Sequence, residues 1–287
     1  MLLTASSVTF VIIKIMNTHI TVGNNISIPT LGFGTWQLTG QECVEGVAYA
    51  LGLGYKLIDT ADGYGNHLQV AEGIKNSGVK REDIFITTKL RYPDGYTKDA
   101  VRANGERFLK ELNTDYIDLL LIHWPNRTVP FGETLLEMNE LKKEGKIRAI
   151  GVSNFTEHHL DDALTSGIEI VNNQVEIRPQ WAQKALREYC ASKNISVTAY
   201  SSLRGGDPDV PLIVGLAEAY GKTPSQIILN WVIVRGMLAI PKSAHTTRIK
   251  ENFESASFEM SEEDLAKIDG LPQTTRANVP PFADFEY

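Results

Sequence analysis

The feature that most limits the possible folds of this sequence is a regular alternation, from residue 41 onward, of predicted helices and short apolar strands. Most of these strands are apolar on both faces, which is typical of parallel strands that are covered on both sides. Eight strand–helix units in about 240 residues match a (β/α)8 TIM barrel in number and in length. The predicted strands cover residues 56–61, 84–88, 117–123, 147–152, 171–176, 196–201, 237–241 and 255–258.

Two glycine-containing segments bear on the main alternative, which is an open doubly wound sheet. Residues 31–36 and 51–54 each contain a G-x-G pattern, but neither segment has the third glycine of a dinucleotide-binding fingerprint. The sequence has no P-loop either. The glycines of 51–54 are expected to end a helix. The barrel is therefore favoured over the open sheet.

Proline and hydroxyl residues mark the expected starts of several helices. Pro179 and Pro211 are expected to open helices, because proline is favoured in the first turn. Thr223 and Gln226 have the spacing of a capping box. The predicted helices cover residues 41–51, 69–76, 99–112, 133–144, 156–166, 179–193, 211–220, 227–235, 247–253 and 261–270.

The two ends of the chain carry segments outside this alternation. Residues 19–22 and 26–29 flank a Gly/Asn loop and predict a β-hairpin that caps the amino-terminal end of the barrel. Residues 1–16 have no basic n-region and no cleavage pattern, and their apolar run is too short to cross a bilayer. We expect them to extend from a single domain over 17–287. The tail 273–287 is expected to be irregular and to lie across the mouth of the barrel.

Composition narrows the possible partners and the compartment. The net charge of −7 leaves no basic stripe for nucleic acid. Cys43 and Cys190 lie far apart and have no CxxC spacing, which is typical of a reducing compartment and gives no metal framework. These features predict a cytoplasmic protein without a membrane or nucleic-acid partner, and the acidic surface favours a monomer.

Four chemically capable side chains follow predicted strand ends. Asp59 and Tyr64 follow one strand, Lys89 follows the next, and His123 follows the third. A barrel gathers residues at the carboxyl ends of its strands over one central point. A phenol has an ordinary pKa of about 10, and a nearby ammonium is expected to lower it. The set suits protonation of an oxygen that becomes negative when hydride adds to a carbonyl.

Each of these residues taken alone has an ordinary structural explanation. An Asp at a strand end often caps a helix, and a single Lys is usually a solvated charge. A single Tyr or His in such a place is more often packed or exposed than catalytic. The four residues together, at three successive strand ends, favour a catalytic site.

The sequence resembles the aldo-keto reductase family from about His19 to Phe258. The resemblance is strongest to bacterial members that act on glyoxals and 2,5-diketogluconate. Nine dispersed segments match the family in the right order. They are LGFGTW at 31–36, DTADGY at 59–64, TTKL at 87–90, LLIHWP at 120–125, IGVSNF at 150–155, NNQVE at 172–176, AYSSL at 199–203, IPKS at 240–243 and RIKEN at 248–252.

The resemblance implies a metal-free reduction of carbonyls by NADPH (NADP+ when oxidised). It implies that Tyr64 is the proton donor, that Lys89 and Asp59 tune it, and that His123 orients the substrate. Trp36, His123 and Trp124 would contact the substrate. The residues implied for the cofactor are Thr35, Asp59, Ser153, Asn154, Gln174, Tyr200, Ser201, Leu203, Lys242, Ser243, Arg248, Glu251 and Asn252.

Physical chemistry supports several of these cofactor assignments. The polar groups of Ser153, Asn154 and Gln174 suit a nicotinamide carboxamide, and the Tyr200 ring would stack on the nicotinamide. The Arg248 guanidinium suits a 2′-phosphate, which favours NADPH over NADH.

Three positions depart from the usual family pattern. Arg91 follows TTKL, where many relatives have an aromatic residue, and it would favour substrates that bear a carboxylate. His67 replaces an acid, and Ser202 replaces a proline. Small aldehydes, α-dicarbonyls and keto sugars are the substrates that the resemblance implies.

Two other functions are compatible with parts of the sequence. A metal-dependent hydrolase would use His123, His158 and His159. The last two are adjacent and point about 100° apart on a helix, so they are expected to be a solvated helix start. A protein that binds NADPH without catalysis, as a sensor or an accessory subunit, is the other alternative.

Overall fold

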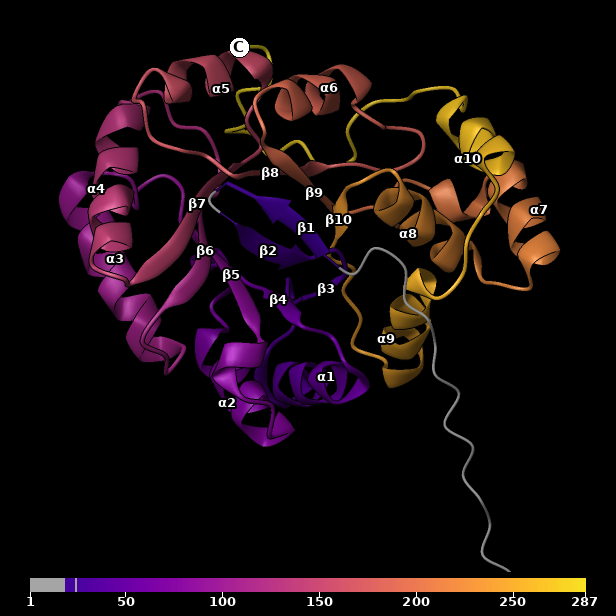
Figure 1. Ribbon diagram of the computed structural model, residues 1–287, viewed down its shortest axis with the longest axis horizontal. Coiled ribbons are helices and arrows are strands. Elements are labelled where there is room, and N and C mark those ends of the chain that lie inside the picture. The colour runs from indigo at the N-terminus through magenta and orange to yellow at the C-terminus, as the bar shows by residue number, and fades with distance from the viewer. Residues whose placement is uncertain (1–18, 24) are drawn as a thin grey trace, which may run out of the picture.

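The computed structural model describes residues 19–23 and 25–287, and the predicted extension 1–16 lies outside these residues. Eight parallel strands form one sheet in which neighbours in the chain are neighbours in space (Figure 1). Helices surround the strands, so the predicted (β/α)8 barrel is confirmed. The strands are β3 (Gly32–Gly34), β4 (Leu57–Asp59), β5 (Phe85–Leu90), β6 (Ile117–Ile122), β7 (Ile147–Ser153), β8 (Asn172–Glu176), β9 (Ser196–Tyr200) and β10 (Leu238–Ala239).

The two outermost strands, β3 and β10, meet and nearly close the barrel. Leu31 forms a parallel bridge with Ala239, and the Gly34 amide donates to the Pro241 carbonyl at 3.0 Å. This approach requires glycine, because a Cβ at position 34 would lie 2.6 Å from the Ile240 carbonyl oxygen. The closed sheet brings the carboxyl ends of all its strands to one rim.

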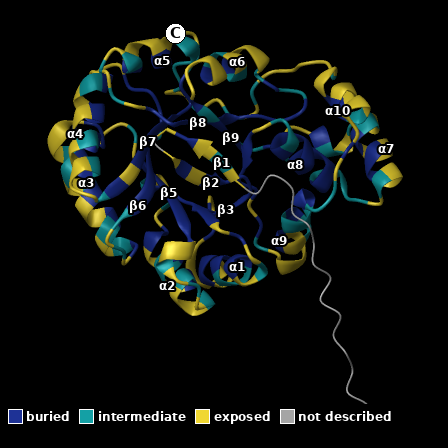
Figure 2. Cartoon of the chain, in the orientation of Figure 1, coloured by how far each residue is buried: buried dark blue, intermediate teal, exposed yellow. Residues whose placement is uncertain are grey.

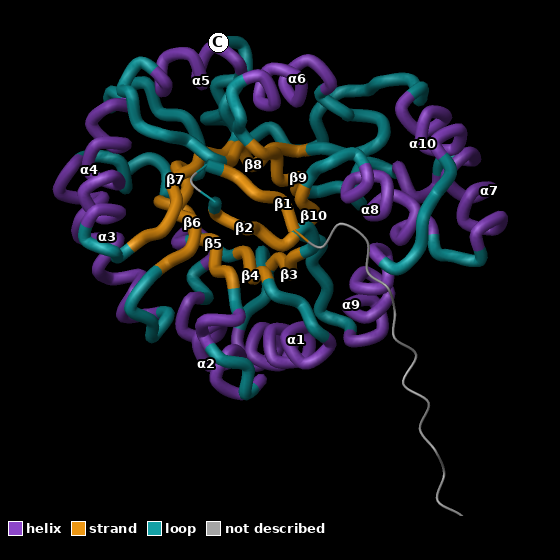
Figure 3. Tube along the Cα trace, in the orientation of Figure 1, coloured by secondary structure: helices purple, strands orange, loops and turns teal. Residues whose placement is uncertain are grey.

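The predicted hairpin is present as β1 (His19–Val22) and β2 (Ile26–Pro29), which pair in antiparallel fashion. Figure 3 shows these two strands lying across the barrel opening. Val22, Ile26 and Ile28 share a buried apolar cluster with Leu57 and Phe85, the first residues of β4 and β5. The hairpin therefore covers the amino-terminal end of the barrel, as predicted.

The helices form the outer layer and turn their buried faces toward the strands (Figure 2). Capping boxes start α5 at Thr156 and α8 at Thr223, the second as predicted. Gly54 ends α1 in the left-handed conformation, with φ of 113°. The helices are α1 (Gly40–Leu53), α2 (His67–Ser77), α3 (Lys98–Glu111), α4 (Phe131–Lys143), α5 (Glu157–Leu164), α6 (Lys184–Ser192), α7 (Pro211–Tyr220), α8 (Pro224–Val234), α9 (Thr246–Phe253) and α10 (Glu262–Asp269).

Two element predictions are wrong. Residues 255–258, predicted as the last strand, follow α9 through the 3-10 helix η4 (Glu254–Ala256), and β3 supplies the eighth strand. Pro179 does not open α6, because residues 178–181 form a turn closed by a bridge between Arg178 and Trp181. Gln183 then adopts a left-handed conformation before the helix begins.

The tail 273–287 has no helix or strand and packs near the carboxyl-end rim of the barrel. The Phe282 ring contacts Trp124, which follows β6, with 5.3 Å between ring centroids. Cys43 and Cys190 are buried and free. No helix in residues 19–23 and 25–287 is long and apolar enough to cross a membrane.

Candidate active site

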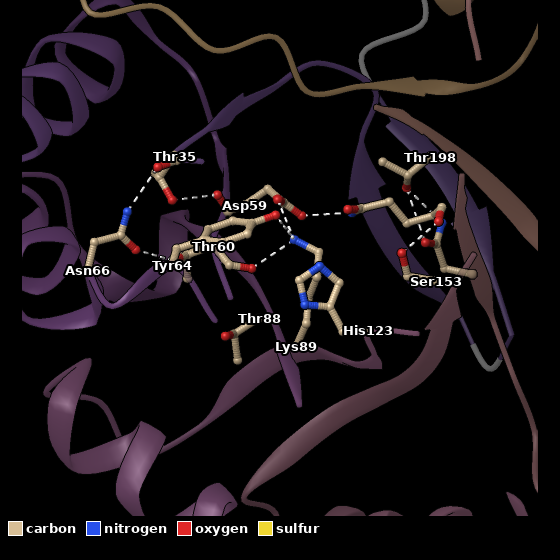
Figure 4. A network of polar contacts seen from close by, with 12 residues as sticks. Thr35, Asp59, Thr60, Tyr64, Asn66, Thr88, Lys89, His123, Ser153 and Thr198 are labelled. Carbon is tan, nitrogen blue, oxygen red and sulfur yellow. Dashed lines mark hydrogen bonds and ion pairs between the residues drawn. The ribbon is translucent and has the colours of Figure 1, made fainter. Parts of the chain in front are cut away.

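A buried ammonium group joins the first three of the predicted catalytic residues. Lys89 is fully buried on β5, and its Nζ donates to Asp59 Oδ1 at 2.6 Å and to the Thr60 carbonyl at 2.9 Å. The same Nζ lies 3.2 Å from the Tyr64 hydroxyl (Figure 4). The structure thus places Asp59, Lys89 and Tyr64 together, with the lysine in the middle.

The local sequence explains how the phenol reaches this lysine. Asp59 is the last residue of β4, and the chain then enters the 3-10 helix η1 (Asp62–Tyr64). Gly65 ends η1 with φ of 65°, a conformation that glycine adopts without strain. The short turn returns Tyr64 over the strand end, so its hydroxyl faces the neighbouring β5.

Burial favours the neutral forms of Lys89 and Tyr64. Desolvation lowers the pKa of Lys89, and the carboxylate of Asp59 opposes that shift. Desolvation, and then the charge of Asp59, raises the pKa of Tyr64 well above its ordinary value. The Tyr64 pKa in the free protein is therefore raised rather than lowered as expected, because burial is the largest cause of the shift. The phenol is protonated throughout the neutral range.

His123 follows β6 and completes the group of four. Its ring lies edge-on to Tyr64, with 5.8 Å between centroids. Burial, and then the charge of Lys89, lowers the His123 pKa well below its ordinary value. The imidazole is therefore neutral, and a neutral imidazole has one N–H to donate. The His123 carbonyl accepts a hydrogen bond from the Asn154 amide at 3.0 Å.

Polar residues at the ends of β7, β8 and β9 face the same centre. Gln174 donates its side-chain amide to Asp59 Oδ2 at 2.7 Å, and Ser153 donates to the Gln174 carbonyl at 2.7 Å. Tyr200 donates its hydroxyl to Asn154 Oδ1 at 2.7 Å. Of the residues implied for the nicotinamide, Gln174 is thus bonded directly to the Asp59 carboxylate.

These residues line one cavity of about 440 Å³ at the rim of the barrel. Tyr64, His123 and the two tryptophans Trp36 and Trp124 form part of its wall. The other predicted site residues that line it are Asp59, Ser153, Asn154, Gln174, Tyr200, Ser201, Leu203 and Lys242.

The remaining predicted cofactor residues lie outside the cavity wall. Thr35 is buried behind it and donates its hydroxyl to the Asp59 carbonyl at 2.9 Å. Ser243 is buried and accepts from the His245 amide at 3.0 Å. Arg248, Glu251 and Asn252 lie on α9, where Arg248 is exposed and Asn252 is buried.

Besides Ser202, three polar residues of the cavity wall were not predicted as site residues from the sequence. Gln37 follows Trp36, and Arg204 follows the AYSSL segment and lies over the Trp36 ring at 4.7 Å. Both residues lie next to segments that match the family. This proximity is the sequence signal that could have identified them. Asn278 comes from the tail, and the tail carried no motif that would have pointed to it.

The three departures from the family pattern occupy different places. Ser202 is buried in the cavity wall. His67 is buried behind the site, where it contacts Thr88 and Glu111. Arg91 is exposed and does not line the cavity, so the cavity offers no support for its expected role with carboxylates.

The two adjacent histidines do not meet His123. His159 is fully buried, so the expectation that it forms a solvated helix start is wrong. Its Nδ1 accepts from the Thr156 amide at 3.3 Å, while His158 is exposed and lies against the Tyr287 ring. In residues 19–23 and 25–287, no group of three or more His, Cys, Asp or Glu side chains is arranged to hold a metal ion.

Comparison with known proteins yields consistent matches along the chain. The aldo/keto reductase family model matches residues 30–207 and 208–272. A glyoxal reductase of Bacillus subtilis is 42% identical over 262 residues, covering 90% of this chain and 94% of that protein. Methylglyoxal reductase DkgA of Escherichia coli is 39% identical over 259 residues, with 88% and 93% covered.

A solved structure supports the same relationship. The crystal structure of an aldo/keto reductase from Brucella melitensis superposes with a TM-score of 0.84 at 40% identity, covering 88% of this chain and 98% of that one. The family model and the sequence relatives each span most of the chain, and the barrel geometry agrees with them. The chain is therefore an oxidoreductase of the aldo/keto reductase family, whose members reduce carbonyl compounds and generally use nicotinamide cofactors.

Proposed function

We propose that this protein reduces small aldehydes, α-dicarbonyls and keto sugars to alcohols, with NADPH as the cofactor and Tyr64 as the proton donor. The observation that carries this proposal is the position of the Tyr64 hydroxyl. It lies 3.2 Å from the Lys89 ammonium and on the wall of the cavity that His123 also lines. A protonated phenol is thereby available to a carbonyl oxygen in that cavity.

The chemistry of the cavity wall fits the nicotinamide end of the cofactor. The amide and hydroxyl side chains of Asn154, Gln174 and Ser153 line this wall together with Tyr200. The amide and hydroxyl groups can form hydrogen bonds with a carboxamide. The Tyr200 ring can stack on the face of an aromatic ring. When bound there, the reduced nicotinamide supplies a hydride to the carbonyl carbon.

The protein's own residues then have distinct tasks. The neutral His123 donates a hydrogen bond to the carbonyl oxygen and fixes its position. Tyr64 gives its proton to that oxygen as negative charge develops on it. Lys89 stabilises the resulting phenolate, and Asp59 holds the ammonium at 2.6 Å. The tryptophan rings of Trp36 and Trp124 provide an apolar wall for the substrate.

Two exposed cations, Lys242 in the cavity wall and Arg248 on α9, support the choice of NADPH. Lys242 and Arg248 are exposed, and neither forms an ion pair with any residue of the described part of the chain. A phosphate group is a suitable partner for such free cations, and a guanidinium can bind it in a bidentate manner. The 2′-phosphate of NADPH is such a group, and NADH lacks it.

The substrate class rests on the relatives and on the size of the cavity. The two sequence relatives are named for glyoxal and methylglyoxal, which are small dicarbonyls. A cavity of about 440 Å³ with aromatic residues in its wall accommodates small carbonyl compounds of this kind.

A substrate panel tests the proposal directly. The purified protein is mixed with NADPH and with aldehydes, ketoses and α-dicarbonyls, and the loss of NADPH absorbance is recorded. We expect turnover with α-dicarbonyls and small aldehydes, and unchanged rates after treatment with a chelator. NADPH fluorescence that reports binding, together with no turnover on any carbonyl, would instead favour the non-catalytic sensor.

A further inference from the structure

His67 lies directly behind the proposed active site and takes no part in the mechanism described above. It begins α2, is 3% exposed and packs edge-on against the Phe108 ring at 5.0 Å. It does not line the cavity. Any effect of His67 on the reaction must therefore pass through its neighbours.

Both ring nitrogens of His67 have partners in other elements. Nε2 lies 2.8 Å from the Thr88 hydroxyl, and Nδ1 lies 2.8 Å from Glu111 Oε2. Thr88 is fully buried on β5, immediately before Lys89. Successive side chains of a strand point to opposite faces, so Lys89 points into the barrel while Thr88 points to the helix layer.

The Glu111 side of this arrangement leads back to the turn that carries Tyr64. Arg107 Nη1 donates to Glu111 Oε1 at 2.9 Å, and Arg107 Nη2 donates to Asp62 Oδ1 at 2.8 Å. Asp62 begins η1, two residues before Tyr64. A continuous series of polar contacts therefore runs behind the barrel wall from the residue next to Lys89 to the turn that ends in Tyr64.

The chemistry of the partners fixes the tautomer of His67. Burial lowers the His67 pKa despite the opposing effect of Glu111, so the ring is neutral at neutral pH. The ionised Glu111 can only accept a hydrogen bond, so Nδ1 carries the proton. Nε2 is then an acceptor, and the Thr88 hydroxyl donates to it. Each hydrogen bond therefore has one defined donor and one defined acceptor, which suits a fixed arrangement of His67 relative to Thr88 and Glu111.

We propose that His67 is a positioning residue for carbonyl reduction, because it joins the β5 strand behind Lys89 to the turn that carries Tyr64 and so keeps these two residues in hydrogen-bonding contact. This inference rests on the proposed function of Tyr64 as proton donor. The contact with Thr88 is the decisive one, since Thr88 is the residue bonded directly to Lys89 along the chain.

Two single substitutions separate the contacts of His67. In His67→Gln, the amide oxygen takes the place of Nε2 and can still accept from Thr88, whereas the contact with Glu111 is lost. In His67→Asn, the shorter amide takes the place of Nδ1 and can still donate to Glu111, whereas the contact with Thr88 is lost. His67→Leu removes both contacts, and Thr88→Val removes the same hydroxyl from the other side.

The expected result is a decrease in kcat without a change in cofactor affinity. His67→Asn, His67→Leu and Thr88→Val should each lower kcat by about tenfold to a hundredfold, the scale of a small displacement of catalytic groups. His67→Gln, which keeps the Thr88 contact and loses only the Glu111 contact, should lower kcat less than His67→Asn does. The dissociation constant for NADPH should be unchanged in all four. Combining His67→Leu with Thr88→Val should add little to His67→Leu alone, since both variants remove the same contact between residues 67 and 88.

A purely structural role predicts a different pattern. The variants would then melt at lower temperature but, when folded, would turn over at the wild-type kcat, and that result would overturn the inference. If wild type is active, Tyr64→Phe is inactive and these variants are unaffected, the proposed function stands and this inference alone fails.

A crystal structure of His67→Leu gives a test that is independent of activity. We expect the distance between Lys89 Nζ and Tyr64 Oη to exceed the 3.2 Å of the unmodified protein. An unchanged distance would contradict the proposed role of His67, even if the wild-type protein had no carbonyl substrate in the panel.

Discussion

At the scale of single residues, burial sets the charge of each group in the proposed site. It raises the Tyr64 pKa, with a contribution from Asp59, and lowers the His123 pKa, with a contribution from Lys89. Tyr64 is consequently a protonated phenol and His123 a neutral imidazole at neutral pH. A proton donor and a hydrogen-bond donor are thus both in their competent forms before any substrate arrives.

The Tyr64 assignment predicts a selective loss of turnover. Tyr64→Phe should reduce kcat by about a hundredfold to ten-thousandfold, because only proton delivery is removed. The NADPH dissociation constant, measured by fluorescence titration, should be nearly unchanged. Tyr49→Phe on α1, outside the cavity, is the matched control and should behave as wild type. Equal turnover in wild type and Tyr64→Phe would reject Tyr64 as the donor.

The assignment of Arg248 to the 2′-phosphate predicts selectivity for NADPH over NADH. Arg248→Ala should weaken NADPH binding by about 1.5–3 kcal/mol, which corresponds to the loss of a charged hydrogen bond. NADH binding should change little, because NADH has no 2′-phosphate. Lys250→Ala on the same helix is the control, since Lys250 is exposed and faces Glu254 at 3.9 Å. A similar loss for both cofactors in isothermal titration would remove the 2′-phosphate assignment.

At the scale of elements, strands rich in apolar side chains were predictable from the sequence. β6 has apolar residues at all its positions except Asp118, and its predicted boundaries lie within one residue of the observed ones. Asp59 and Lys89 lie at the carboxyl ends of β4 and β5, and His123 follows β6, so these strands were the signal that located them. Their convergence follows from the barrel topology alone.

β3 and residues 255–258 could not be assigned from local sequence. β3 is Gly-Phe-Gly, and glycine is depleted in strands, but Gly32 and Gly34 are required here by the close approach of Leu57 and Ile240. Residues 255–258 alternate small and apolar side chains like a strand. Asn230 of α8, however, donates to the carbonyls of Ser255 and Phe258 at 2.8 Å and holds them in a compact turn.

The position of the tail predicts an effect on substrate binding rather than on cofactor binding. Phe282 stacks on Tyr92 at 4.5 Å and meets Trp124 edge-on at 5.3 Å, so it supports one wall of the cavity. Phe282→Ala should raise the KM for carbonyl substrates by roughly threefold to tenfold, the loss of about 0.5–1.5 kcal/mol of aromatic contact. The NADPH dissociation constant should not change.

A control substitution in the same tail distinguishes this effect from a general weakening of the packing of the tail. Val279 is 61% exposed, and Val279→Ala should leave KM at the wild-type value. If Phe282→Ala altered NADPH binding and left KM for the carbonyl unchanged, the tail would belong to the cofactor side of the cavity instead.

At the scale of the whole molecule, three histidines tie folding stability to pH: His67 and His159 are buried, and His123 is half-buried. Burial is the first cause that lowers the pKa of His67, His123 and His159 in the folded chain. The unfolded chain binds protons to these histidines near their ordinary pKa of about 6.5. Below that pH the unfolded state therefore binds more protons than the folded state, and acid favours unfolding.

We accordingly expect the free energy of unfolding to be constant around neutral pH and to fall as the pH decreases from about 6.5 through the folded-state pKa values. Urea titrations at a series of pH values measure this slope. His123→Gln removes one of the three titrating groups and should make the slope shallower. His158→Gln, at an exposed position next to a buried histidine, should leave it unchanged. Stability that rises on acidification would show that these histidines are charged in the folded protein, and His123 could not then be the neutral hydrogen-bond donor that the mechanism requires.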